Sequence, residues 1–151
     1  MADFGPGVSD AGGVQSGARA SFWLRLAAAL IDGVMLAVIG SIIRAVLGDV
    51  LGSAVNILLG LAYYAYLEGS PSGQTVGKRA MSIRVIDING GGSIGPGRAL
   101  IRYIGRYVSA IPCGLGFFWM LWDSEKQTWH DKFASSVVVP TSAYPVAAWP
   151  G

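Results

Sequence analysis

An aspartate inside a long apolar stretch constrains this chain more than any other residue. Residues 26–47 read LAAALIDGVMLAVIGSIIRAVL, and Asp32 lies about two turns into them. An ionisable side chain at that depth in a membrane costs a few kcal/mol or more unless it faces protein or water and finds a partner. Arg25 precedes Asp32 by seven residues, so both lie on one face of a helix. The stretch therefore predicts a spanning helix whose carboxylate is held by a polar partner.

The composition is typical of an integral membrane protein with one domain. The 151 residues are 52% hydrophobic and 13% charged, whereas soluble domains are roughly 25% charged. The mean hydropathy is +0.50. A net charge of +2 is too small to indicate a nucleic-acid partner. The lone cysteine, Cys113, excludes an internal disulfide and is interpreted as a packing residue.

Two spans with a short connection are predicted. Residues 20–47 are expected to form the first helix and residues 50–67 the second, with a tight turn at Gly48 and Asp49. Asn56 is a polar group inside the second span and is expected to form a hydrogen bond across the pair. Lys and Arg are concentrated before the first span and after the second. The positive-inside rule therefore predicts a multi-pass protein of the cytoplasmic membrane with a cytoplasmic N-terminus.

The rest of the chain predicts a small sheet and a third apolar element. Residues 81–88 and 135–140 are β-branched runs that could pair on one side of the membrane. Between them, residues 98–122 are apolar but are interrupted near their middle by Pro112 and two glycines. One straight third span would separate the strands, so a bent or re-entrant hairpin is preferred to it. The predicted fold class is an all-α membrane protein with two transmembrane helices, this bent third element and a small cytoplasmic β-element.

The order of these features resembles the RDD family of membrane proteins, named for one arginine and two aspartates. The segments that carry the resemblance are FWLRLAAALID at 22–32, GQTVGKRAMSIRVID at 73–87, GRALIRY at 97–103 and WHDKFASSVVV at 129–139. By position, the resemblance implies that the arginine is Arg25 and that the aspartates are Asp32 and Asp131. It also implies a membrane domain over residues 19–140. Transport or ion exchange has been proposed for some members of the family.

Residues 1–18 and 141–151 are interpreted as a disordered N-terminal tail and a flexible C-terminal tail, because they are rich in small residues and proline.

Two groups of charged residues are candidates for function. Arg25, Asp32 and Asp131 could form a buried structural network or an ion path. Three arginines at i, i+4 and i+8 on one helical face, together with two cations of the GQTVGKR turn, predict contacts to anionic lipid headgroups. These five residues are Arg98, Arg102, Arg106, Lys78 and Arg79.

Other chemistry receives little support from the residues. GGGSIG at 90–95 matches a dinucleotide-binding pattern, but no parallel sheet and no acidic residue at the required spacing accompany it. His130 is the only histidine, and no cluster of metal ligands or catalytic triad surrounds it. We therefore expect no enzyme, metal or cofactor. The first hypothesis is a membrane scaffold or accessory subunit; an oligomeric ion or solute exchanger and an anionic-lipid-binding module are the alternatives.

Overall fold

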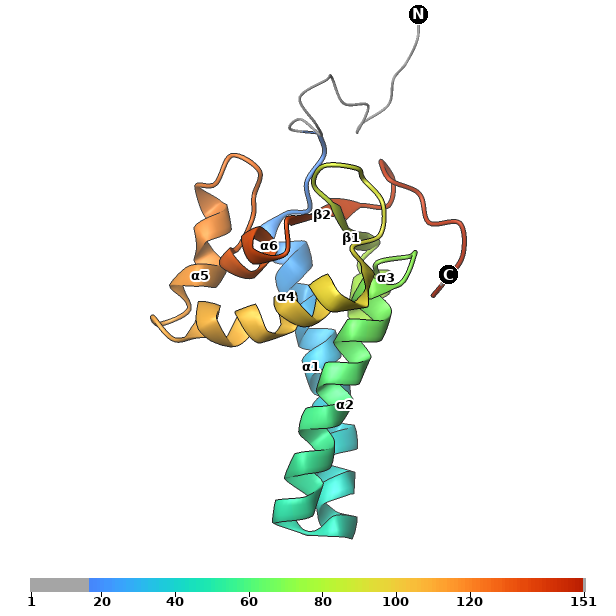
Figure 1. Cartoon of the computed structure of the whole chain (residues 1–151), viewed down its shortest axis with the longest axis vertical. Helices are drawn as coiled ribbons and strands as arrows, with labels where there is room; N and C mark the ends of the chain where they lie inside the picture. The colour runs from blue at the N-terminus through green and yellow to red at the C-terminus, as the bar shows by residue number, and fades with distance from the viewer. Residues whose placement is uncertain (1–16, 151) are drawn as a thin grey trace, which may run out of the picture.

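Two long antiparallel helices form the stem of the protein (Figure 1). The structure is a computed structural model that describes residues 17–150. Helix α1 (Phe22–Leu47) begins after Ser21, whose hydroxyl accepts a hydrogen bond from the Leu24 amide at 3.3 Å. Gly48, with a φ of 81°, turns the chain into α2 (Asp49–Gly69). Both helices are long and apolar enough to cross a membrane, as the sequence predicts.

The two stem helices are joined by close backbone approach and one polar contact. Gly52 lies against the backbone of Arg44, where a larger side chain has no room. Asn56 donates from Nδ2 to the Gly40 carbonyl at 3.0 Å, which confirms the predicted bond across the pair. At the far end, Arg44 forms an exposed ion pair with Asp49 at 2.8 Å. Most large side chains on the stem point outwards and are apolar, as a lipid-facing surface requires.

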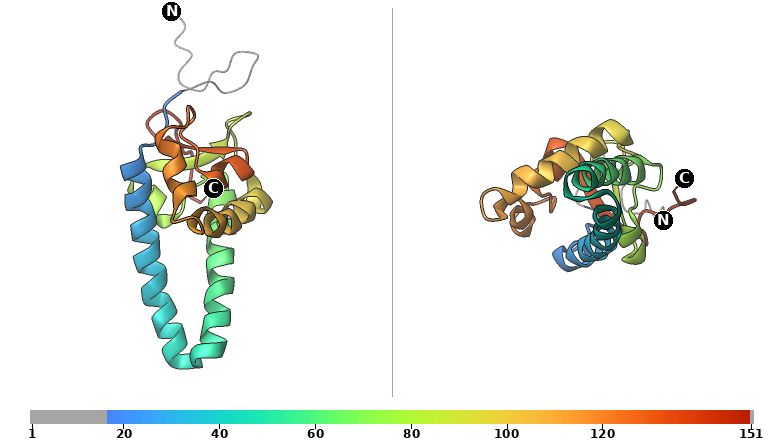
Figure 2. Two further views of the ribbon diagram at one scale, coloured as in Figure 1. Left: turned by 90° about the vertical axis from the view of Figure 1, so that its left-hand side faces the viewer. Right: turned by 90° about the horizontal axis from the view of Figure 1, so that it is seen from below.

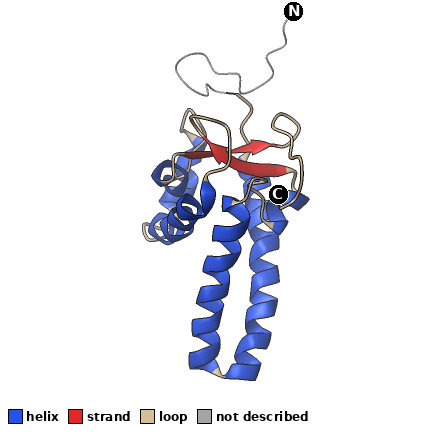
Figure 3. Cartoon of the chain, turned by 45° about the vertical axis from the view of Figure 1, so that its right-hand side comes forward, coloured by secondary structure: helices blue, strands red, loops and turns tan. Residues whose placement is uncertain are grey.

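A two-stranded antiparallel sheet lies at the other end of the stem (Figure 3). Strand β1 (Ile83–Asp87) pairs with β2 (Ser136–Pro140), and Val85 lies opposite Val138. The predicted β-element is thereby confirmed. Both faces of the sheet are buried: Ile83 and Val85 belong to one apolar cluster, and Ile86 belongs to another. This two-sided burial explains why the alternation of apolar residues fades along the strand.

The third apolar region is bent, as predicted. Helix α4 (Gly95–Ala110) lies across the stem, and a break follows at 111–114. Helix α5 (Leu115–Phe118) and the 3₁₀ turn η1 (Trp119–Leu121) then run at 112° to α4. The segment leaves β1 and returns to β2, so it begins and ends on the same side of the stem (Figure 2). The alternative of one straight third span is therefore wrong.

Two five-residue helices complete the part of the chain beyond the stem, residues 70–150, which we call the head. Helix α3 (Val76–Ala80) is capped by Thr75, and α6 (Trp129–Phe133) begins with a capping box between Thr128 and Asp131. Gly105 allows α6 to pack on α4, since a Cβ at that position would lie 2.9 Å from the Cβ of His130.

The C-terminal residues of the head contact its other segments. Arg84 donates to the Pro145 carbonyl at 2.8 Å, and the Trp149 indole donates to the Gln74 carbonyl at 3.0 Å. The predicted flexible tail at 141–151 thus has defined contacts over its described part. Of the predicted N-terminal tail, residues 1–16 lie outside the described residues.

The fold predicts that the connection between the stem helices and the C-terminal segment lie on opposite sides of the membrane. With Cys113→Ser as background, Asp49→Cys and Ser142→Cys should react with a membrane-impermeant maleimide from opposite faces of sealed vesicles. A permeant maleimide should label both variants and serves as the control. Labelling of both variants from one face would contradict the topology.

Candidate functional site

Charged side chains from five helices meet where the stem joins the head. Glu68, near the end of α2, is fully buried and lies at the centre. It accepts from Lys78 Nζ at 2.6 Å, from Arg102 Nε at 3.0 Å and from Arg106 Nη2 at 2.5 Å. These cations lie on α3 and α4. One carboxylate therefore holds three cations, and through them it connects the stem to two helices of the head.

Asp131 is the second buried carboxylate of this group. It lies on α6 and accepts from Arg25 Nη2 at 2.5 Å and from the Thr128 amide at 3.0 Å. Its other oxygen accepts from Arg102 Nη1. Arg102, which is 1% exposed, thus bridges Asp131 and Glu68. We call these six residues the ionic network: Arg25, Glu68, Lys78, Arg102, Arg106 and Asp131.

The environment keeps the Asp131 carboxylate charged. Burial alone would raise the pKa of Asp131, but the positive charges of Arg25 and Arg102 outweigh it and hold that pKa well below its usual range. Burial lowers the pKa of Lys78, and the adjacent Glu68 carboxylate opposes this shift. Breaking a buried pair by removing one partner typically costs about 3–5 kcal/mol, because the other charge stays buried.

Asp32 lies outside the ionic network. Its Oδ1 accepts from the Tyr63 hydroxyl at 2.6 Å and from the Gly77 amide at 2.7 Å, and its Oδ2 accepts from the Thr75 hydroxyl at 2.6 Å. No described residue forms an ion pair with it, so the expected grouping of Asp32 with Arg25 and Asp131 is only partly met. Arg25 pairs with Asp131, whereas Asp32 fastens α3 to the stem through neutral donors.

The basic stripe of α4 faces the protein. Arg98 pairs with Asp87 at 2.9 Å and also donates to the carbonyls of Ala134 and Ser135. Arg102 and Arg106 belong to the ionic network, as does Lys78. Arg79 alone of the five predicted headgroup contacts is exposed, and its guanidinium lies 4.7 Å from the centre of the Trp149 ring.

The opposite face of α4 is apolar and exposed. Its outward side chains are Ile101, Ile104 and Val108, and the exposed Ile111 follows directly after the helix. The stripe interpretation identified the basic face correctly but assigned it to lipid headgroups. In the structure, Arg102 and Lys78 are buried and face the interior of the protein, so they do not form an open basic surface. The physical reason is that Glu68 and Asp131 provide the negative charge that headgroups were expected to supply.

Sequence reasoning missed Glu68. The residue directly follows the apolar run of the second span and begins a polar, turn-rich segment, so it reads as the first residue of a loop. The structure extends α2 by one residue beyond it. The available signal was an excess of cations after the second span, which requires buried negative charge if any of them packs inside.

His130 is a buried neighbour of the network. Its ring lies 3.0 Å from the Thr128 hydroxyl and 3.3 Å from the Ser109 hydroxyl. Burial lowers its pKa well below the usual value, and the nearby arginines lower it further against the opposing charge of Asp131. Within residues 17–150, no cluster of three or more His, Cys, Asp or Glu side chains is arranged to hold a metal ion.

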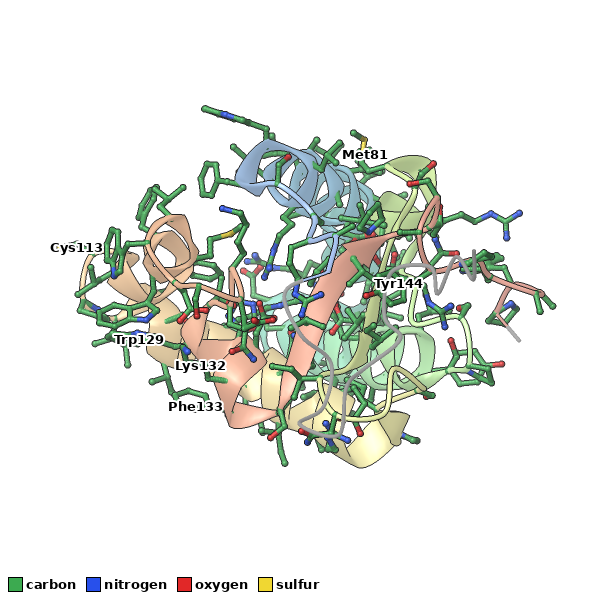
Figure 4. The ribbon with its side chains drawn as sticks, turned by 90° about the horizontal axis from the view of Figure 1, so that it is seen from above. Met81, Cys113, Trp129, Lys132, Phe133 and Tyr144 are labelled. Carbon is green, nitrogen blue, oxygen red and sulfur yellow. The ribbon has the colours of Figure 1, made fainter. Side chains whose placement is uncertain are left out.

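Lys132 and Phe133 are exposed on the outer side of α6 (Figure 4). The ion pair of Lys132 with Asp123, at 2.7 Å, is an outer contact of the head. The functional candidates of α6 are therefore the two residues on its inner side, His130 and Asp131.

Comparisons with known proteins agree with this architecture. The family model described as RDD family matches residues 19–135. The chain is 38% identical over 77 residues to a proline-rich antigen of Mycobacterium leprae, covering 51% of this chain and 30% of that protein. It is 36% identical over 85 residues to a proline-rich antigen homolog of Mycobacterium tuberculosis (strain H37Rv), covering 54% and 35%. The match thus spans about a third of each relative. No solved structure matches the chain.

The pairing pattern predicts which residues are coupled energetically. In double-mutant cycles, Arg25→Gln and Asp131→Asn should show a coupling free energy of about 1 kcal/mol or more, because they share an ion pair. Arg25→Gln and Asp32→Asn should be additive to within about 0.5 kcal/mol. Reversible unfolding in mixed micelles measures both cycles. A larger coupling to Asp32 than to Asp131 would contradict the assigned partners.

Burial of His130 predicts a loss of stability on mild acidification. The unfolded chain takes up a proton near pH 6.5, whereas the buried ring, with its depressed pKa, stays neutral. The free energy of unfolding should therefore fall from pH 7.5 to 5.5, by at most about 1.4 kcal/mol per pH unit. His130 is the only histidine, so His130→Gln should flatten this slope. An equal slope in the variant would contradict the prediction.

Proposed function

We propose, from the premise that this chain belongs to the RDD family, that it is a non-enzymatic membrane scaffold or accessory subunit. In this proposal the stem anchors the chain in the bilayer, and the ionic network holds the head rigidly at the membrane surface. The observation that carries the proposal is the complete pairing of Glu68 and Asp131 by cations from α1, α3 and α4. Carboxylates held by several cations are suited to fixing helices and poorly suited to exchanging ions.

The stem gives further support. In the part of the stem that follows Asp32 in the chain, the charged residues are Arg44, Asp49 and Glu68. The first two pair with each other at the far end, and Glu68 belongs to the network. The stretch of α1 between Asp32 and Arg44 offers no titratable side chain that could relay a proton or bind a cation. Two spans would also need a second copy to enclose a path, so an exchanger would have to be an oligomer.

The relatives are compatible with a module that is used in longer chains. The matched segments account for 30% and 35% of two proteins named proline-rich antigen and its homolog. A membrane module of this kind would place attached sequence at the bilayer. For this chain, we propose that the head serves as such an attachment surface for a partner in a membrane complex.

We further propose that the head lies on the cytoplasmic side of the cell membrane. The support is the charge distribution: Lys and Arg gather before α1 and after α2, whereas the far end of the stem has Arg44 offset by Asp49. In intact cells, the Asp49→Cys variant should then react with impermeant maleimide from outside. Reaction of Ser142→Cys from outside would reverse the orientation.

Ion flux separates the scaffold from an exchanger. In proteoliposomes with an imposed proton or sodium gradient, the purified protein should dissipate the gradient no faster than protein-free liposomes do. The critical variant is Asp32→Asn, and Asp49→Asn is its matched control, since Asp49 is an exposed carboxylate at the far end. Flux in the unmodified protein that disappears in Asp32→Asn and persists in Asp49→Asn would overturn the scaffold proposal.

A further inference from the structure

A cavity of about 460 Å³ lies between the first turns of α1 and the head. This volume is in the range of small-molecule binding sites, roughly 300–1,000 Å³. One side of the cavity is formed by charged side chains and the other by apolar ones. The two sides require separate consideration, because together they specify the kind of ligand that fits.

The charged side has an excess of positive charge. Four cations line the cavity: Arg25, Lys78, Arg102 and Arg106. The carboxylates that pair with them, Glu68 and Asp131, are not part of the lining. Asp32 is the one lining carboxylate, and both of its oxygens already accept hydrogen bonds from hydroxyl or amide donors. The electrostatics of this side therefore favour an anion.

Hydrogen-bond donors remain available on that side. Lys78 is 8% exposed, and its ammonium group, with three N–H bonds, donates to a single protein acceptor, Glu68. Arg106 likewise donates to Glu68 from Nη2, and its guanidinium stacks on Tyr64 at 4.1 Å from the ring centre. A bound phosphate or carboxylate could accept from both side chains without displacing Glu68.

The apolar side is continuous with the outer surface of the stem. Phe22 of α1 stacks on Phe118 of α5, with ring centres 5.6 Å apart, and both line the cavity. Leu26 and Ala29 also line it and are exposed on α1. Leu30, the next residue, is 60% exposed and faces the lipid-exposed side of the stem. A ligand could therefore extend from the charged side directly into the hydrocarbon of the membrane.

The height of the cavity along the stem matches the headgroup boundary. The 26 residues of α1 measure about 39 Å at 1.5 Å per residue, whereas the hydrocarbon core is about 30 Å thick. If Leu47 lies at the far boundary, Arg25 and Leu26 lie near the boundary on the head side. An anionic headgroup belongs at this depth, with its chain pointing toward the middle of the bilayer.

We propose that this cavity binds one anionic amphiphile from the surrounding membrane. Its phosphate group contacts Lys78 and Arg106, and its acyl chain leaves over Ala29 between α1 and α5. The binding requires the cation excess of the lining and does not depend on the scaffold role proposed above. It differs from general attraction to a charged membrane surface because the cations concerned point into the protein.

Lipid retention after purification tests the proposal. The protein is exchanged into detergent with phosphatidylglycerol or with phosphatidylcholine of the same chains, and bound lipid is counted by native mass spectrometry. We expect one phosphatidylglycerol per chain and at least about ten-fold weaker retention of phosphatidylcholine, a difference of about 1.4 kcal/mol. Equal retention of the two lipids would overturn the proposal.

Variants at the opening locate the binding site. Ala29→Trp should fill the apolar side and abolish phosphatidylglycerol retention, whereas Val38→Trp, on α1 outside the cavity and 55% exposed, should leave it unchanged. Leu26→Trp replaces Ala29→Trp as the test if the latter lowers the unfolding temperature. Retention that survives tryptophan at the opening, or that is lost equally in Val38→Trp, would place the lipid elsewhere and overturn the proposal.

A charge variant and a soluble anion distinguish the source of the phosphate. Arg106→Gln should weaken phosphatidylglycerol retention about ten-fold or more, the equivalent of one charge-assisted hydrogen bond. Inorganic phosphate should raise the unfolding temperature less than phosphatidylglycerol does at equal concentration, because it lacks the apolar contacts. An equal or greater shift with inorganic phosphate would assign the site to a soluble phosphate and overturn the assignment to a lipid.

Discussion

The guanidinium of Arg102 holds the stem and the head together. It is buried between Glu68 of α2 and Asp131 of α6, and it donates to both carboxylates. Without it, Glu68 would keep Lys78 and Arg106 and Asp131 would keep Arg25, but no residue of the ionic network would join the two carboxylates. A planar guanidinium suits this place because it directs donors in fixed directions toward two acceptors at once. Arg102 therefore couples the positions of α4 and α6 to each other, in addition to the separate pairs that Arg106 and Arg25 form across the junction.

The need for an ionic junction follows from the surroundings of the stem. Apolar side chains gain little by leaving lipid for another apolar helix, so packing alone determines helix positions weakly in a bilayer. Polar contacts are directional and select one arrangement. In this chain they also orient α4, whose basic face contacts Glu68 and Asp131. The same rotation turns Ile101, Ile104 and Val108 outwards, where they are exposed. One amphipathic helix thereby contacts the ionic network with one face and leaves an apolar face exposed.

Features encoded by nearby residues were predictable from the sequence. The lengths of the two spans follow from continuous apolar runs, the strands from β-branched runs, and the bend from the glycines and proline between 112 and 116. The pair of Arg25 with Asp131 was suggested by the resemblance to a family.

Features that depend on how distant segments dock were not predictable. The direction of the basic stripe depends on where Glu68 lies in space. The partners of Asp32 depend on the position of α3, which reaches α1 only because Gly77 has no side chain to meet Ala28 and Asp32. An amphipathic pattern identifies two faces of a helix, but it does not state which one meets protein.

The separation of Asp32 from the ionic network has an electrostatic consequence. The junction has four cations and three carboxylates in either case, but an Asp32 that accepted from Arg25 would engage one of the lining cations from within the cavity. Instead Asp32 is satisfied by Tyr63, Thr75 and the Gly77 amide, all neutral donors. Glu68 and Asp131, which do not line the cavity, pair with the cations on the side away from it. The lining that faces the cavity therefore stays positive, and the joint that fastens the head to the stem is also the place where a negatively charged membrane component is most strongly attracted.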